Sequence, residues 1–282
     1  MPPSGGIRFS GPGARPVPRP VIAFAALVAL MYLGLCAALF VFQRSLIYFP
    51  QPCPPEAEAR AVPLTADGAR LLVTVREHEG RGAVLYFGGN AEIVPLTVPE
   101  LAQAFPGRAL YLPHYRGYCG STGSPSEDSL LSDALAAYDM VRAAHDDIVV
   151  VGRSLGSAMA VHVAGRRTVS GLMLVTPFDS LETVAARHYP FFPVRLLLRD
   201  RFDSRSRAAG VAAPTLILAA ERDEIVPPES ARRLRDAFRP GLARMVVVPG
   251  AGHNTVPVTA EHAELLRRTA GGVTSGAAGA VR

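Results

Sequence analysis

Two kinds of apolar run alternate along most of this 282-residue chain. Short runs rich in Val, Ile and Leu predict buried strands, and longer stretches with apolar residues three or four apart predict helices. The predicted strands are residues 71–75, 83–87, 109–112, 148–151, 172–175, 215–219 and 245–248, and the predicted helices are residues 129–144, 155–164, 228–237 and 260–270. This alternation predicts an α/β fold with a mostly parallel, doubly wound sheet.

One apolar run near the N-terminus is too long for either kind of element. Residues 20–43 carry no charge, and as a helix they would measure about 36 Å, against about 30 Å for the hydrocarbon core of a bilayer. The run therefore predicts one N-terminal transmembrane helix. A cleaved signal peptide is the alternative, but its small-residue cleavage candidates, around Cys36, would fall inside the run.

The charges on the two sides of this run are asymmetric. Arg8, Arg15 and Arg19 precede it without an acidic residue, and Arg44 stands alone just after it. The positive-inside rule then predicts a cytoplasmic N-terminus and a catalytic domain on the exported, periplasmic or extracytoplasmic side. The first three arginines supply part of the net charge of +5, and the remaining balance gives no reason to expect nucleic-acid binding.

Shifts in composition divide the chain into segments. Residues 1–19 predict a disordered basic tail, and residues 44–60 predict a stiff, proline-rich linker before an α/β domain at 61–270. Residues 181–209, between two predicted strands, are too long for a simple crossover and predict a small cap, whose apolar side chains either pack on the body or also line an acyl pocket. Residues 271–282 predict a flexible tail.

A GxSxG sequence lies directly between a predicted strand and a predicted helix. It consists of Gly152, Arg153, Ser154, Leu155 and Gly156. Strand, GxSxG and helix in this order are typical of a nucleophile elbow, in which the serine occupies a turn so tight that side chains two positions away would collide. The pattern therefore predicts that Ser154 is a catalytic nucleophile.

A serine hydroxyl needs a base that is itself held by an acid. Asp223 follows the predicted strand at 215–219, and His253 lies in a glycine-rich loop after the predicted strand at 245–248. Their order and their positions at the carboxyl ends of strands predict a catalytic triad of Ser, Asp and His. Asp179, which follows another predicted strand, is an alternative acid.

The tetrahedral intermediate of acyl transfer carries an oxyanion, which backbone N–H groups stabilise. In a nucleophile-elbow enzyme these groups come from the residue after the serine and from the loop after the third strand. Leu155 follows the serine, and the sequence Gly-Gly-Asn, which ends at Asn90, follows the predicted strand at 83–87. The amides of Leu155 and Asn90 are therefore the predicted oxyanion hole.

Together these residues resemble the α/β-hydrolase superfamily and, more narrowly, its single-pass, membrane-anchored serine hydrolases. The resemblance runs from Phe42 to the helix after His253, and it includes Tyr-Arg-Gly-Tyr at 115–118 and Thr-Pro-Phe at 176–178. The resemblance implies the α/β-hydrolase fold with a small cap.

Two positions differ from the pattern of these relatives. The relatives commonly have His where this chain has Gly88, so a side chain that often holds the oxyanion loop is missing. They often have Asp where this chain has His114, so an ion pair between that position and Arg116 is not expected.

The triad and the resemblance predict a serine hydrolase of carboxylic esters or thioesters. Ser154 would form the acyl-enzyme, His253 would accept the proton and later activate water, and Asp223 would orient the imidazole. The anchor and the apolar cap suggest lipid-like acyl substrates, and no cofactor or metal is expected. The alternatives are a serine peptidase or acyltransferase on the same triad, and a catalytically inactive, membrane-anchored binding protein.

The basic residues and the cysteines exclude other chemistries. All 29 basic residues are arginine, which excludes Ser–Lys dyads and lysine Schiff bases. Cys36, Cys53 and Cys119 lie in three different predicted segments and predict no metal cluster. A disulfide between Cys53 and Cys119 is conceivable in an oxidising compartment, but free thiols are the expectation.

Overall fold

The computed structural model of the protein describes residues 18–277. The chain divides into two compact units, the first ending at Phe42 and the second beginning at Gln43. Residues 1–17 of the predicted basic tail and residues 278–282 of the predicted flexible tail lie outside the described residues.

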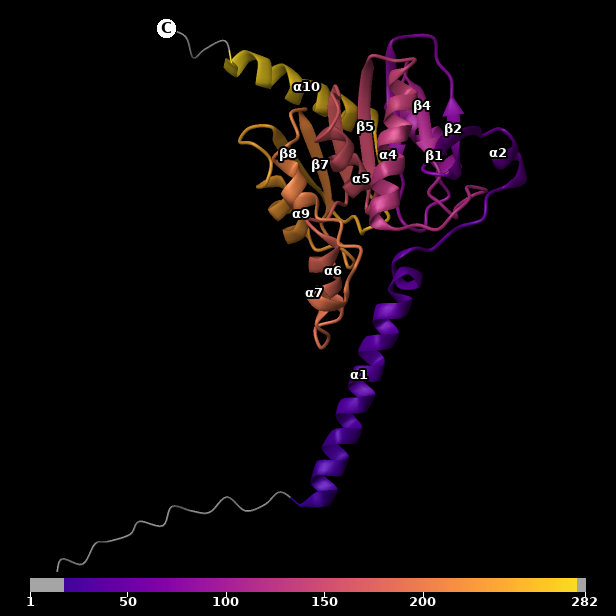
Figure 1. Cartoon of the computed structure of the whole chain (residues 1–282). Coiled ribbons are helices and arrows are strands. Elements are labelled where there is room, and N and C mark those ends of the chain that lie inside the picture. The colour runs from indigo at the N-terminus through magenta and orange to yellow at the C-terminus, as the bar shows by residue number, and fades with distance from the viewer. Residues whose placement is uncertain (1–17, 278–282) are drawn as a thin grey trace, which may run out of the picture. The chain divides into compact units, whose positions relative to one another are not determined.

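Helix α1 (Arg19–Ile47) contains every described residue of the first unit except Pro18 (Figure 1). It has 29 residues and a mean hydropathy of 2.5, and it is long and apolar enough to cross a membrane. Large apolar side chains such as Phe24, Leu30 and Met31 are more than half exposed along it. An apolar helix with most of its large apolar side chains exposed fits a lipid environment better than water.

The second unit is built on one eight-stranded sheet with the order β1-β2-β4-β3-β5-β6-β7-β8 (Figure 1). The strands are β1 (Val62–Ala66), β2 (Ala69–Arg76), β3 (Gly82–Phe87), β4 (Ala109–Pro113), β5 (Asp147–Arg153), β6 (Gly171–Val175), β7 (Thr215–Ala220) and β8 (Ala243–Val248). Strands β1 and β2 pair antiparallel, as do β2 and β4, and every other neighbouring pair is parallel. The predicted mostly parallel sheet is confirmed.

The sequence analysis missed strand β1. It lies at the edge of the sheet, where Val62 pairs with Val73 and Ala66 pairs with Ala69. Val62, Leu64 and Ala66 are apolar at every second position, but only Ala66 is buried, and a five-residue run that contains Pro63 is a weak strand signal. Proline is tolerated at this position because an edge strand leaves some N–H groups without a ladder partner.

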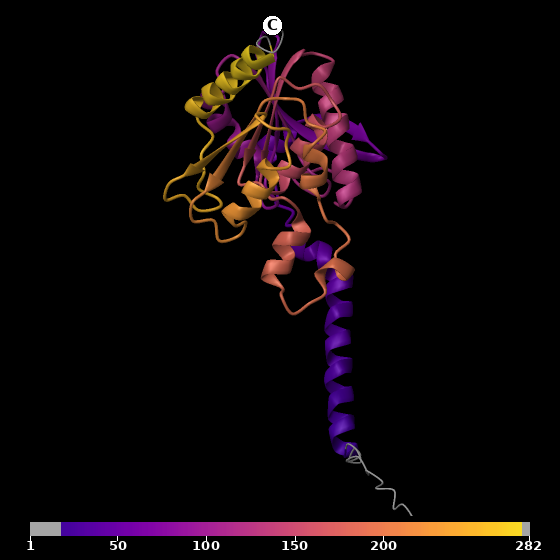
Figure 2. The ribbon, with the colours of Figure 1, turned by 90° about the vertical axis from the view of Figure 1, so that its left-hand side faces the viewer.

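Helices cover both faces of the sheet, as a doubly wound fold requires. Helices α4 (Glu127–Arg142), α5 (Leu155–Ala164) and α9 (Pro228–Arg235) pack on one face, and α3 (Val98–Ala104) and α10 (Ala260–Ala277) on the other. Figure 2 shows α4 and α10 on opposite sides of the strands. All ten residues of α5 are buried, which places this helix at the centre of its layer.

Two helical segments differ from the sequence prediction. The proline-rich linker contains a short helix, α2 (Pro55–Ala59), because Pro55 occupies the first turn, where a missing N–H costs nothing. Helix α10 continues to Ala277, seven residues into the predicted flexible tail, although three of these seven residues are glycines.

The segment predicted as a cap contains three short helices between β6 and β7. They are α6 (Leu181–His188), α7 (Val194–Leu197) and α8 (Ser204–Ala208). Figures 1 and 2 show α6 and α7 projecting from the sheet's end rather than packing on its face. Phe202 and Ala208 are fully buried and hold the second half of the segment on the body.

Candidate active site

Ser154 occupies the turn between β5 and α5 in a conformation that few non-glycine residues adopt. Its φ is 49° and its ψ is −116°, and its N–H donates to the carbonyl of Val175 at 2.9 Å. A Cβ atom at Gly152 would overlap the carbonyl oxygen of Gly156, and one at Gly156 would overlap that of Phe87. The two glycines of GxSxG are therefore required by the close approach of backbone to backbone.

Ser154, His253 and Asp223 form one chain of hydrogen bonds across three loops. The Nε2 atom of His253 lies 2.8 Å from Oγ of Ser154, and its Nδ1 atom lies 2.9 Å and 2.8 Å from Oδ1 and Oδ2 of Asp223. When Nδ1–H donates to the carboxylate, the neutral ring leaves Nε2 as the acceptor for the serine hydroxyl. The structure thus brings together the three residues that the sequence predicts as a triad.

The carboxylate of Asp223 is buried and held by further donors. Its side chain is 2% exposed, and its Oδ1 atom accepts from the N–H groups of Ile225 at 3.0 Å and Val226 at 2.7 Å. These bonds fix the orientation of the carboxylate toward the imidazole of His253. A fixed negative charge in this environment stabilises an imidazolium more strongly than a solvated one would.

Asp179, the alternative acid, is engaged elsewhere. Its carboxylate accepts from Arg233 Nε at 2.7 Å and from the hydroxyl of Ser230. Burial raises the pKa of Asp179, but the hydrogen bonds from Arg233 and Ser230 outweigh burial and lower the pKa below its usual value. Among the hydrogen bonds of residues 18–277, none joins Asp179 to His253.

The loop after β3, residues 88–90, lies beside the serine. A Cβ atom at Gly89 would lie 3.9 Å from the Cβ atom of Ser154. Within the described part of the chain, the backbone N–H groups of Asn90 and Leu155 donate to no protein acceptor. The loop therefore lies next to Ser154, and no hydrogen bond within the described residues uses either predicted oxyanion donor.

Three side chains hold this loop, in which position 88 is a glycine. The hydroxyl of Tyr115 donates to the carbonyl of Gly88 at 2.7 Å, and the carboxylate of Glu92 accepts from the N–H of Gly89 at 2.8 Å. Tyr118 donates to the next carbonyl along, that of Asn90, at 2.7 Å. A side chain at position 88 would overlap Val94, so this arrangement of the loop requires glycine at that position.

The last residue of α1 and the linker that follows it also contact this loop. The side-chain amide of Asn90 donates to the carbonyl of Ile47 at 2.9 Å. The N–H of Phe49 donates to the hydroxyl of Tyr118 at 2.9 Å. The end of α1 therefore holds Asn90 directly, and the linker holds it through Tyr118.

Cys53 and Cys119 form a disulfide, so the expectation of free thiols is wrong at these two positions. Their Cα atoms lie 4.5 Å apart, and the N–H of Cys119 donates to the carbonyl of Gln51 at 3.1 Å. The sequence does not show that the linker runs along the loop after β4, which is what brings the two cysteines together. His114 lies beside the disulfide, but sulfurs joined to each other are not thiolate ligands for a metal.

Arg153, the second residue of GxSxG, connects the elbow to the loop that carries the histidine. Its side chain is 13% exposed and donates to Tyr86 Oη at 3.1 Å, Val256 O at 2.9 Å and Glu100 Oε1 at 3.3 Å. Burial lowers the pKa of Arg153, but the neighbouring phenolic and acidic groups outweigh burial and raise it. The sequence analysis missed this role, although an arginine between an apolar strand and an apolar helix was a signal.

Arg116 has an ion-pair partner on α4. Its guanidinium makes two bonds to Asp133 of α4, at 2.8 Å and 2.7 Å, with both side chains largely buried. His114 instead hydrogen-bonds Thr74 Oγ1 at 2.7 Å. Arg116 therefore has an ion-pair partner although position 114 is a histidine.

The sheet order, the elbow and the Ser-His-Asp chain of hydrogen bonds together define an α/β-hydrolase fold. Residues 132–265 match the family model described as "Serine hydrolase". The chain belongs to this serine hydrolase family within the α/β-hydrolase superfamily, and its membership indicates a hydrolase. It is 41% identical over 251 residues to the uncharacterized protein Rv2307c of Mycobacterium tuberculosis, a match that covers 83% of this chain and 88% of that relative.

Solved structures share the fold at low sequence identity. The esterase Pf2001 of Pyrococcus furiosus superposes with a TM-score of 0.61 at 14% identity, covering 81% of this chain and 97% of the esterase. The monoacylglycerol lipase of Paleococcus ferrophilus superposes with a TM-score of 0.54 at 18% identity, covering 71% of this chain and 98% of the lipase. These likenesses confirm the predicted fold class.

Proposed function

We propose that this protein is a serine hydrolase that cleaves carboxylic esters or thioesters through an acyl-enzyme on Ser154. The observation that carries the proposal is the 2.8 Å contact between Nε2 of His253 and Oγ of Ser154, with Nδ1 of the same ring on Asp223. This is the geometry in which a neutral imidazole removes the hydroxyl proton during attack on a carbonyl.

The proposed reaction has two balanced halves. Ser154 Oγ bonds to the acyl carbon as its proton passes to His253, and that proton then leaves with the alcohol or thiol. Water next gives a proton to His253 and its oxygen to the acyl carbon, which releases the carboxylic acid and restores the serine hydroxyl. The amides of Leu155 and Asn90 stabilise the oxyanion in both halves.

We propose lipid-like acyl groups as the substrate class. The cap beside the site carries apolar side chains, and His188 at the end of α6 contacts the carbonyl of Ile225, two residues after the proposed acid, at 3.0 Å. The printed names of the similar solved structures, an esterase and a monoacylglycerol lipase, are consistent with acyl esters. The fold alone does not determine the substrate, which a substrate panel must identify.

We propose that α1 is an uncleaved membrane anchor with its N-terminus in the cytoplasm. The proposed anchor, residues 20–43, is followed by a linker at 44–60 and a hydrolase domain at 61–270 with its cap at 181–209. The Cys53–Cys119 disulfide supports an exported domain, because disulfides persist mainly in oxidising compartments. The arginines that precede the anchor support the same orientation.

A fluorophosphonate probe on the full-length protein tests the proposal. The expected result is covalent labelling of the wild type and none of Ser154→Ala, followed by hydrolysis within a panel of esters and thioesters. Preferred cleavage of amides would instead indicate a peptidase, and preferred transfer to an added alcohol would indicate an acyltransferase. A folded wild-type protein that the probe does not label would contradict the proposal and leave an inactive binding protein.

A further inference from the structure

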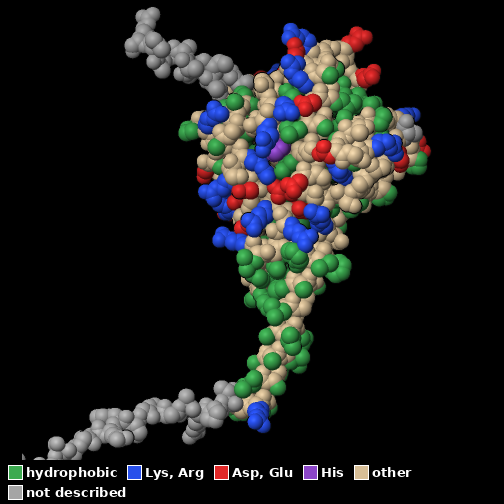
Figure 3. Space-filling model, in the orientation of Figure 1, with side chains coloured by type: hydrophobic (Ala, Val, Ile, Leu, Met, Phe, Trp, Pro, Cys, Tyr) green, Lys and Arg blue, Asp and Glu red, His purple; other side chains and the backbone are tan. Residues whose placement is uncertain are grey.

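The cap ends in exposed apolar side chains. Leu196 on α7 is 81% exposed, Phe191 before it is 84% exposed, and Tyr189 is 43% exposed, whereas Val194 of the same short helix is buried. Figure 3 shows hydrophobic side chains gathered at the lower end of the folded body, while charged side chains occupy the surface above. Contiguous exposed apolar side chains commonly mark a surface that another molecule or a membrane covers.

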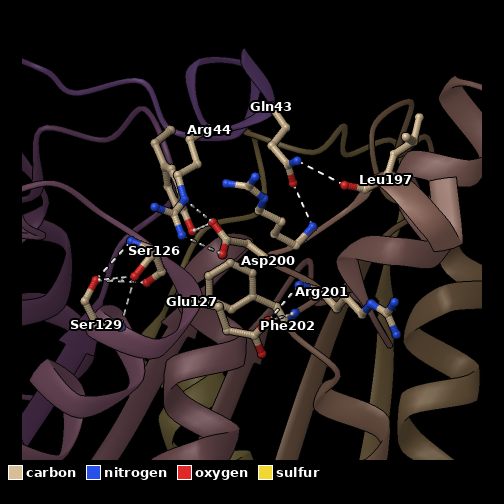
Figure 4. Close-up of polar contacts among 11 residues, drawn as sticks. Gln43, Arg44, Ser126, Glu127, Ser129, Leu197, Asp200, Arg201 and Phe202 are labelled. Carbon is tan, nitrogen blue, oxygen red and sulfur yellow. Dashed lines mark hydrogen bonds and ion pairs between the residues drawn. The ribbon is translucent and has the colours of Figure 1, made fainter. Parts of the chain in front are cut away.

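The amide of Gln43 fixes the cap at the point where the uncharged run of residues 20–43 ends (Figure 4). Its Nε2 atom donates to the carbonyl of Leu197 at 3.0 Å, and its Oε1 atom accepts from the N–H of Arg199 at 2.7 Å. The Gln43 residue is only 7% exposed. A buried amide that both donates to and accepts from one segment holds that segment in one position.

Asp200 strengthens the same attachment. Its carboxylate accepts from Arg44 Nε at 3.2 Å and from the hydroxyl of Tyr48 at 2.9 Å, and the Asp200 side chain is 5% exposed (Figure 4). Charge-assisted bonds of this kind are stronger than neutral ones. The residues that directly follow the cap's apolar tip (residues 189–196) are therefore held by residues at and just after the end of α1.

The body of the domain holds the cap from the other side. Glu127, in the first turn of α4, accepts from the N–H groups of Arg201 at 2.6 Å and Phe202 at 2.9 Å (Figure 4). It also pairs with the guanidinium of Arg207 at 2.7 Å. The part of the cap that follows the tip is therefore held both by residues at the end of α1 and by the body of the domain.

We infer that Phe191 and Leu196 of the cap insert into the lipid bilayer that α1 spans. Gln43 marks the level at which the proposed span leaves the hydrocarbon, and Leu196 lies one residue from the carbonyl that Gln43 binds. Residues 181–209 contain six arginines and three acidic residues, an excess of positive charge that favours anionic headgroups at that level. The inference rests on the proposed anchor and not on the proposed catalysis.

The absence of tryptophan from the chain makes this inference directly measurable. Full-length Leu196→Trp and Phe191→Trp variants are placed in anionic vesicles with and without brominated acyl chains, which quench a neighbouring indole. Leu30→Trp, in the proposed span, serves as the positive control. Val62→Trp, on the exposed edge strand β1, serves as the negative control.

Blue-shifted emission that bromolipids quench is the expected result at positions 196, 191 and 30, with solvent-like, unquenched emission at 62. Quenching at 30 but at neither cap position would overturn the inference and leave the anchor intact. Quenching at none of the three would refute the anchor and the inference with it. Blue-shifted but unquenched emission at the cap would show that protein and not lipid covers it, which also overturns the inference.

Discussion

The hydroxyl of Tyr118 donates to the carbonyl of Asn90 at 2.7 Å while it accepts from the N–H of Phe49 at 2.9 Å. One side chain from the loop after β4 therefore joins the linker to the loop that carries a proposed oxyanion donor. An oxyanion hole works by holding its donors in place before the charge develops. Removing the Tyr118 hydroxyl should therefore affect the transition state more than substrate binding.

Tyr118→Phe should therefore lower kcat about tenfold, which corresponds to about 1.4 kcal/mol, with KM nearly unchanged. Steady-state kinetics on an ester substrate measure both constants. Tyr138→Phe is the matched control, because the Tyr138 hydroxyl donates to the carbonyl of Thr168 away from the proposed site. Equal losses in the two variants, or a change in KM alone, would show that Tyr118 does not position the loop.

The disulfide should make a large contribution to stability. Cys53 and Cys119 are 66 residues apart, and closing a loop of that length removes about 4 kcal/mol of chain entropy from the unfolded state. Cys53→Ser, or reductant added to the wild type, should lower Tm by several degrees. Cys36→Ser is the control and should retain the wild-type response to reductant. Equal alkylation of Cys53 with and without reduction would contradict the disulfide.

The elbow predicts a sharp difference between two glycine substitutions. Gly156→Ala should cost about 3 kcal/mol or more, because the new Cβ atom would overlap the backbone of Phe87 and Gly88. Gly210→Ala should cost little, because its Cβ atom would make only ordinary contacts, the nearest at 3.4 Å from the carbonyl of Arg207. Denaturant unfolding of both variants measures the difference, and similar midpoints would contradict the tight turn.

His162 on α5 should make stability depend on pH. Burial, followed by the charges of Arg166 and Arg207, lowers the pKa of His162 to about 4 from an ordinary 6.5. Between these values the unfolded chain binds a proton that the folded protein does not, so stability should fall as the pH drops from 6.5 toward 4. The expected contribution is about 2 kcal/mol, which is less than the whole shift because solvent screens part of it.

The variant His162→Gln isolates this contribution. Its free energy of unfolding should fall less steeply than that of the wild type between pH 6.5 and 4, as measured by denaturant titration at several pH values. His188→Gln, on an exposed residue of the cap, should keep the wild-type slope. Identical slopes in the wild type and His162→Gln would refute the assignment.

Local sequence patterns predict the parts of this fold that depend on nearby residues. Helix α5 has the predicted bounds because a tight turn begins it and an unbroken run of small and apolar residues continues it. Strand β1 is missed because Pro63 and its exposed neighbours hide a strand whose partner is the longer strand β2. A helix or strand with a clear pattern of apolar residues can therefore be predicted from the sequence, whereas an edge strand that depends on pairing with its neighbour is easily missed.

The residues of the site also fall into those that the sequence predicts and those that it does not. Ser154, Asp223 and His253 follow predicted strands, and parallel strands bring their carboxyl ends to one edge, so the sequence predicts that they meet. The contacts of Arg153 with Val256, and of Tyr118 with Asn90, join loops whose paths depend on the whole fold. No local pattern marks such contacts, and they are the ones that only the structure shows.

The most direct test of the central claim is peptide mass spectrometry after fluorophosphonate treatment of the full-length protein, with His253→Gln beside the wild type. We predict an adduct on the peptide that contains Ser154, formed at least about a hundredfold more slowly in His253→Gln because the general base is absent. An adduct elsewhere, or one that forms on Ser154 at the same rate without the imidazole, would contradict a serine hydrolase that works through His253.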